Sequence, residues 1–217
     1  MLLGLVLSAG CLLDVDGDGV REILFAGDSN TRYLSCAYPY TWQARHDPNV
    51  LRAQNEGLFA TTAHFWVDNG VLQAALLRDE PDAVVIALGT NDVGQRIPPI
   101  LVMANLMTLY RQAVSHTLPN GSHPVAAIAT VPPVYDPAGL DPAGTAAKNA
   151  DIRTLNALIR SWLPASRVVD FDSWMPAEWD AAFMATNMLG KPDPIHISCG
   201  AHEIRADLID DLVIRIE

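Results

Sequence analysis

Residues 22–30 read EILFAGDSN, an apolar run that passes directly into a glycine followed by three polar residues. The apolar part is short and continuous, which is typical of a strand buried on both faces of a parallel sheet. In open α/β sheets, ligands bind beyond the carboxyl ends of the strands. This stretch therefore predicts a parallel sheet and places a candidate site directly after its first strand.

The rest of the chain alternates between apolar runs of the same kind and longer segments with helical spacing. Strand–helix alternation of this kind predicts an α/β protein, a three-layer α/β/α sandwich around a five-stranded parallel sheet. We assign residues 22–217 to one domain. The expected strands are Glu22–Ala26, Val50–Gln54, Ala83–Leu88, Val125–Thr130 and Arg167–Phe171, and the expected long helices are Ile100–His116, Thr145–Leu163 and Ala201–Ile216.

Composition excludes several classes of protein. Half of the 217 residues are apolar, which is enough for a sizeable core and argues against disorder. Fourteen Lys and Arg stand against 25 Asp and Glu, a net charge of -11, so no basic surface for nucleic acid is expected. No apolar stretch is long enough for a transmembrane helix, and three cysteines are too few for a disulfide scaffold.

Residues 1–13 resemble a signal segment, because an apolar run ends in small residues before Cys11. The segment Ser8-Ala9-Gly10-Cys11 is similar to a lipoprotein processing site, which would make Cys11 a lipid anchor. No Lys or Arg precedes the run, and the alternative is a buried N-terminal segment of a cytosolic protein. We favour export, to the periplasm, the medium or a membrane surface.

Residues 14–21 form an acidic, glycine-containing segment with carboxylates at alternate positions. Asp14, Asp16 and Asp18, with Glu22, could supply oxygen ligands to calcium. The twelfth position is Phe25, however, so the bidentate acid of an EF-hand is missing. The segment is either a partial calcium loop or a linker, and we favour the linker.

Four polar segments follow the expected strands or precede the last helix, so the sheet should bring them to one edge. A serine hydroxyl needs a neighbouring base, and an imidazole titrates near neutrality. Asp193 lies three residues before His196, close enough to hold its tautomer. Ser29 is thus a candidate nucleophile. The four segments are Gly27-Asp28-Ser29-Asn30, Asn55-Glu56-Gly57, Gly89-Thr90-Asn91-Asp92 and Asp193-Pro194-Ile195-His196.

Attack on an ester carbonyl creates an oxyanion, which requires preorganised donors. The backbone N–H groups of Ser29 and Gly57 and the side-chain amide of Asn91 could supply them. Gly57 has no side chain that would keep substrate from its N–H group. Asp28 and Asp92 are expected to support loop structure through hydrogen bonds.

With these four segments in this order, the sequence resembles the SGNH hydrolase family, also called GDSL-type esterases. The resemblance runs from about residue 22 to the C-terminus. It implies a flavodoxin-like sheet and metal-free hydrolysis of esters or thioesters. It also implies Ser29 as nucleophile, Gly57 and Asn91 as oxyanion donors, His196 as base and Asp193 as its orienting acid. Asn30 replaces the family's common Leu.

We therefore expect a serine esterase that acts on short acyl groups, such as acetyl esters of carbohydrate, without a cofactor. A thioesterase or lysophospholipase of the same family is the alternative. An inert carbohydrate- or lipid-binding module is the non-enzyme rival. An α/β-hydrolase is excluded because the chain has no G-x-S-x-G elbow.

Further residues near these segments admit two interpretations. Trp174 and Trp179 could line the substrate cleft or pack beneath loops. His202 is expected on the surface of the last helix. Cys36 and Cys199 could form a disulfide between the first helix and the His196 segment, or could be two free thiols.

Overall fold

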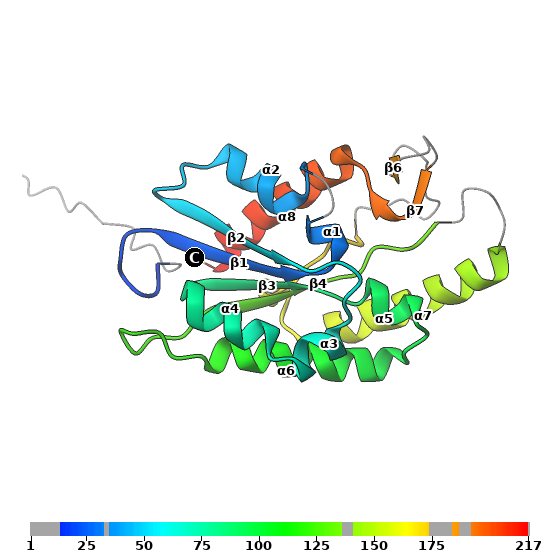
Figure 1. Ribbon diagram of the computed structural model, residues 1–217, viewed down its shortest axis with the longest axis horizontal. Helices are drawn as coiled ribbons and strands as arrows, with labels where there is room; N and C mark the ends of the chain where they lie inside the picture. Colours follow the sequence, from blue (N-terminus) through cyan, green and yellow to red (C-terminus); the bar gives the residue numbers. More distant parts are fainter. Residues whose placement is uncertain (1–13, 33–34, 136–140, 174–183, 187–191, 217) are drawn as a thin grey trace, which may run out of the picture.

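A five-stranded parallel sheet forms the centre of the computed structural model, which describes residues 14–32, 35–135, 141–173, 184–186 and 192–216 (Figure 1). The neighbouring strands pair in parallel throughout, in the order β2-β1-β3-β4-β5. The predicted α/β class and flavodoxin-like sheet are confirmed, because this strand order is that of the flavodoxin-like fold. The strands are β1 (Arg21–Gly27), β2 (Leu51–Gly57), β3 (Ala83–Ala87), β4 (Val125–Ala129) and β5 (Val168–Val169).

Helices cover both faces of this sheet and give the three layers (Figure 1). The alternating side chains of β3 show why both faces need cover: Val84 and Ile86 join one buried cluster, and Val85 joins the other. One face carries α2 (Tyr38–Arg45) and α8 (Cys199–Ile216). The opposite face carries α3 (Ala63–Asp68), α4 (Val71–Asp79), α6 (Pro99–Ser115) and α7 (Pro142–Trp162).

Short elements at both edges of the sheet complete the fold. Two of them follow strands directly, α1 (Ser29–Arg32) after β1 and α5 (Thr90–Gly94) after β3. A 3-10 turn, η1 (Ala165–Arg167), leads into β5. Two strands, β6 (Met184–Thr186) and β7 (Pro192–Ile197), pair antiparallel in a separate sheet. The elements α2 to α5, β6 and β7 were not predicted from the sequence.

The acidic segment at residues 14–20 is attached to the domain. Asp82 accepts hydrogen bonds from the backbone N–H groups of Val15 and Glu22, at 2.7 and 2.8 Å. Within the described ranges, the single group of potential metal ligands is Asp14, Asp16 and Asp18, whose oxygens lie within 4.8 Å of one another. Glu22 is engaged elsewhere, in an ion pair with Arg52.

Some predicted features lie outside the described residues. These are the apolar segment 1–13 with Cys11, and the two candidate cleft residues Trp174 and Trp179. Among the helices that the structure does describe, none is both long and apolar enough to cross a bilayer.

Candidate active site

Ser29, His196 and Asp193 form a continuous chain of hydrogen bonds. Ser29 Oγ lies 2.8 Å from His196 Nε2, and His196 Nδ1 lies 2.9 Å from Asp193 Oδ2. Ser29 begins α1 directly after β1, whereas His196 and Asp193 belong to β7, outside the main sheet. The structure thus brings together three side chains that the sequence places up to 167 residues apart.

The hydrogen bonds define the tautomer of His196. Burial acts to raise the pKa of Asp193, but hydrogen bonds from the His196 side chain and from the backbone N–H groups of His196 and Ile195 hold that pKa below its usual value. An ionised carboxylate can only accept, so His196 Nδ1 carries the proton. Nε2 of the neutral ring is then free to accept from the Ser29 hydroxyl.

Asp193 also shapes the backbone around His196. Its Oδ1 accepts from the N–H groups of Ile195 and His196, at 2.9 and 3.0 Å. One carboxylate therefore fixes both the local backbone and the imidazole ring. Only the second role was predicted from the sequence, although an Asp that accepts from N–H groups two and three residues later is a common turn feature.

Gly57 ends β2 opposite Gly27, at the edge where Ser29 follows β1. Its N–H group donates to Asn55 Oδ1 at 3.0 Å, so this predicted oxyanion donor already has a partner. A Cβ at Gly57 would lie 2.8 Å from the Arg32 Cβ. The glycine is thus required by the close approach of α1, which is a different reason from the one that the sequence suggested.

Asn91 lies in α5 at the carboxyl end of β3, beside the end of β1. Its Nδ2 donates to the Thr61 carbonyl at 2.9 Å, and an amide nitrogen carries a second hydrogen. The neighbouring Asp92 is fully buried and accepts from the Ala63 N–H group at 2.9 Å. Burial raises the pKa of Asp92. As predicted, Asp92 supports the loop structure, because it anchors α5 to the start of α3.

Asp28 supports the turn that carries Ser29. It precedes α1, and its Oδ1 accepts from the Asn30 N–H group at 2.9 Å. Its backbone carbonyl accepts from the Thr31 N–H group at 3.1 Å. These bonds use helix N-terminal donors that have no partner within the helix. The predicted structural role of Asp28 is confirmed.

A disulfide joins Cys36 to Cys199, and this answers the question that the sequence left open. It links the segment before α2 to the first residue of α8, three residues after His196. His202, one turn further along α8, is only 2% exposed, so its predicted surface position is wrong. Its Nδ1 accepts from the Tyr38 N–H group at 3.2 Å, because α2 packs on this face of α8.

A sequence profile of the GDSL-like Lipase/Acylhydrolase family matches residues 25–203, most of the chain. The chain is a member of this family. The match covers Ser29, Gly57, Asn91 and the Asp193–His196 pair. No curated protein sequence matches the chain significantly.

Solved structures with the same fold include other GDSL-like proteins and esterases. A carbohydrate acetylesterase family member from Sinorhizobium meliloti is 18% identical, with a TM-score of 0.68 over 91% of this chain and 99% of that one. The aryl esterase of M. smegmatis is 17% identical, with a TM-score of 0.66 over 89% of this chain and 100% of that one. A member of the lipolytic G-D-S-L family from Veillonella parvula is 15% identical, with a TM-score of 0.65 over 88% of this chain and 97% of that one. At these identities the likeness establishes the fold.

Proposed function

We propose that this GDSL-like protein is a serine esterase in which Ser29 is the nucleophile. The observation that carries the proposal is the hydrogen-bonded chain from the Ser29 hydroxyl through His196 to Asp193. A serine hydroxyl is activated when a base is within hydrogen-bond reach and a third group orients that base. Membership of an acylhydrolase family supports the same chemistry.

In the proposed reaction, Ser29 Oγ attacks the ester carbonyl while His196 Nε2 takes the hydroxyl proton. The carboxylate of Asp193 stabilises the imidazolium that forms. The tetrahedral intermediate collapses to an acyl-enzyme, and Nε2 returns its proton to the leaving alcohol. Water then attacks the acyl group with His196 as base, which releases the acid and restores Ser29.

The proposed oxyanion donors are the N–H groups of Ser29 and Gly57 and the amide of Asn91. All three lie at the carboxyl edge formed by β1, β2 and β3. The bond from Gly57 to Asn55 must be shared or exchanged when the oxyanion forms. Loss of one such donor typically lowers turnover by about 10²–10³-fold.

For the substrate, we propose short acyl esters, such as acetyl groups on carbohydrate. Two structural neighbours from Sinorhizobium meliloti are described as carbohydrate acetylesterases, which supports this choice by analogy. The proposed chemistry uses only protein groups and needs no cofactor. The Cys36–Cys199 disulfide supports the further proposal that the protein works in an oxidising compartment outside the cytoplasm.

The test combines substrates and covalent labelling. Hydrolysis of p-nitrophenyl esters of increasing acyl length, with acetylated xylan beside them, should be fastest for acetate. An organophosphonate probe should label the peptide that contains Ser29. The Ser29→Ala variant should lose both signals, and the control Ser161→Ala, at an exposed serine of α7, should keep them.

Two results would overturn the proposal. Unchanged hydrolysis in Ser29→Ala would remove the nucleophile assignment. If the unmodified protein neither hydrolyses esters or thioesters nor reacts with the probe, a binding module with an inert site is the better description. A preference for thioesters or long acyl chains would support the thioesterase or lysophospholipase alternative.

A further inference from the structure

The proposed base belongs to an element outside the main sheet. His196 lies on β7, which among the described strands pairs only with the three-residue strand β6. Ser29, in contrast, begins α1 at the end of β1, inside the main sheet. The distance of 2.8 Å between Ser29 Oγ and His196 Nε2 therefore depends on contacts that hold these two elements together.

The start of α2 and the residue pair before it grip α8 at two points. Cys36 is bonded to Cys199, the first residue of α8, and their Cα atoms are 5.5 Å apart. The N–H group of Tyr38 donates to Nδ1 of His202, one turn further along α8, at 3.2 Å. Because β7 ends two residues before α8 begins, these contacts hold the helix directly behind the strand that carries the base.

The same segment contacts the nucleophile side through the Tyr38 hydroxyl. This oxygen lies 3.3 Å from Oγ1 of Thr31, which follows Ser29 by two residues in α1. Tyr38 and Thr31 are both fully buried, so bulk water cannot replace the contact. The carbonyl of Thr31 also accepts from Asn55 Nδ2 at 2.9 Å, so the backbone of α1 is held from β2 as well.

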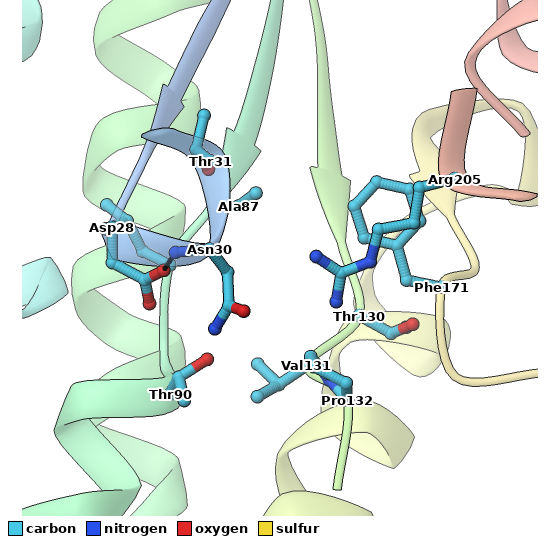
Figure 2. A pocket seen from close by; sticks show the side chains of 11 residues that line it. Asp28, Asn30, Thr31, Ala87, Thr90, Thr130, Val131, Pro132, Phe171 and Arg205 are labelled. Atoms are coloured by element: carbon cyan, nitrogen blue, oxygen red, sulfur yellow. Dashed lines mark hydrogen bonds between the residues drawn. The ribbon is translucent and has the colours of Figure 1, made fainter. Parts of the chain in front are cut away.

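The ring of Tyr38 is held in place by an aromatic neighbour. It packs edge-on against Phe171, which follows β5, with the ring centroids 5.2 Å apart. Figure 2 shows Thr31 and Asn30 on one side of a small pocket, and Phe171 and Arg205 on the other. Tyr38 contacts a residue from each side, so its hydroxyl is presented to α1 from a fixed position.

We propose that residues 36–38 are a brace that sets the distance between Ser29 and His196, that Tyr38 is a positioning residue, and that the Cys36–Cys199 bond makes this brace sensitive to dithiols. The proposal rests on the proposed function. At one end the brace holds α8 through the disulfide and through the Tyr38 N–H group. At the other end it holds α1 through the Tyr38 hydroxyl.

The disulfide is open to a dithiol reductant from solvent. Cys199 is exposed and Cys36 is partly exposed, beside an open hollow of about 440 Å³ that Cys36 helps to line. A thiolate of the dithiol attacks Cys199 Sγ, the S–S bond breaks, and Cys36 leaves as a thiolate that takes up a proton. The second thiol of the reductant then displaces Cys199. The protein disulfide gains two electrons and two protons, and the dithiol is oxidised to a disulfide.

The first experiment removes the hydroxyl contact. Tyr38→Phe and Thr31→Val each delete one partner, and Tyr110→Phe, at a partly buried tyrosine of α6 on the opposite face, is the matched control. Each of the first two should lower kcat for p-nitrophenyl acetate about tenfold with KM unchanged, since a misplacement of about 1 Å can cost about 10²-fold. The double variant should fall no further than the single ones, because both remove the same contact. The control should keep kcat.

The ¹⁵N chemical shift of His196 Nε2 is a readout that a merely structural role would not move. It reports whether this nitrogen accepts a hydrogen bond from Ser29. In Tyr38→Phe it should move toward the value in Ser29→Ala, where the bond is absent, whereas Tyr110→Phe should keep the value of the unmodified protein. A general loss of stability without displacement of Ser29 would leave this shift unchanged.

Dithiothreitol tests the disulfide end of the brace, at a temperature well below Tm. Reduction should lower kcat about tenfold while circular dichroism still shows a folded protein, and reoxidation should restore it. The Cys36→Ala/Cys199→Ala variant should have the lower kcat and should not respond to dithiothreitol. In Tyr38→Phe, reduction should lower kcat by clearly less than tenfold, because both changes release the same brace.

Several results would overturn the proposal. If kcat and the His196 Nε2 shift of Tyr38→Phe equal those of the Tyr110→Phe control, Tyr38 has no positioning role. A reduced protein that keeps its full kcat, or that loses activity only by unfolding, contradicts the sensitivity to dithiols. If the unmodified protein has no esterase activity, the proposed function fails, whereas the Nε2 shift in Tyr38→Phe and in the reduced protein still decides on the brace.

Discussion

Removal of the Cys36–Cys199 disulfide should strongly destabilise the protein. The two cysteines are 163 positions apart, so the bond closes a loop that spans most of the domain. In the chain-entropy relation, a loop of about 164 residues stabilises the folded state by about 5 kcal/mol at 25 °C. For a domain of this size, each kcal/mol corresponds to about 2–4 °C in Tm, so Tm should fall by about 10–20 °C.

The assay is urea denaturation and thermal melting of the oxidised protein, the reduced protein and the Cys36→Ala/Cys199→Ala double variant. The m-value should rise when the bond is absent, because the unlinked unfolded chain exposes more surface. The double variant is the control for side reactions of the reductant. Because it has no Cys36–Cys199 bond to reduce, its Tm should be the same with and without reductant. If oxidised and reduced protein melt within about 2 °C of each other, the constraint on the unfolded chain is not the source of stability.

Three further predictions concern single residues. Asp193→Asn should lower kcat for p-nitrophenyl acetate by about 10³–10⁴-fold through loss of the productive tautomer, and an unchanged kcat would contradict the orienting role. Gly57→Ala should lower the free energy of unfolding, measured by urea denaturation, by about 1–3 kcal/mol because of the contact with Arg32. The control Gly94→Ala, whose Cβ would have no atom within 4 Å, should leave the free energy of unfolding unchanged. Equal effects of the two substitutions would refute the packing argument. Burial lowers the pKa of His202 to about 2, so the native state keeps it neutral while the unfolded state protonates it below about 6.5. The stability that neutral His202 contributes is present above pH 6.5. Below pH 6.5 the free energy of unfolding should fall by about 1.4 kcal/mol for each pH unit. Denaturation of the His202→Asn variant at pH 7, 6 and 5 should not show this fall.

The features that the sequence predicted well are those carried by local patterns. Apolar runs marked all five strands of the main sheet, because strands buried on both faces are continuous and apolar. The prediction for β2 was less complete, since Val50–Gln54 covers only part of a strand that runs on through the polar residues to Gly57. The polar residues at the end of β2 and those that follow β1 and β3 were placed at one edge from topology alone.

What the sequence could not supply depends on contacts between distant elements. His202 is buried because α2 covers that part of α8, and no local pattern contains this information. The meeting of Asn30 and Arg205 at one cavity likewise joins residues that are far apart in the chain. Asn55 is a different case, because it lies two residues before Gly57, the local spacing at which an Asn side chain commonly accepts from a backbone N–H group. The short helices α3 to α5 have too few residues for periodicity to reveal them.

The separation of β7 from the main sheet makes the protein modular for engineering. The strand order of the main sheet is complete at β5, and the strand that carries Asp193 and His196 comes later in the chain. A donor segment from a relative could therefore be grafted between Phe171 and Cys199 without any change in the order of the five strands. The bond to Cys36 then sets the point at which such a graft must rejoin the host.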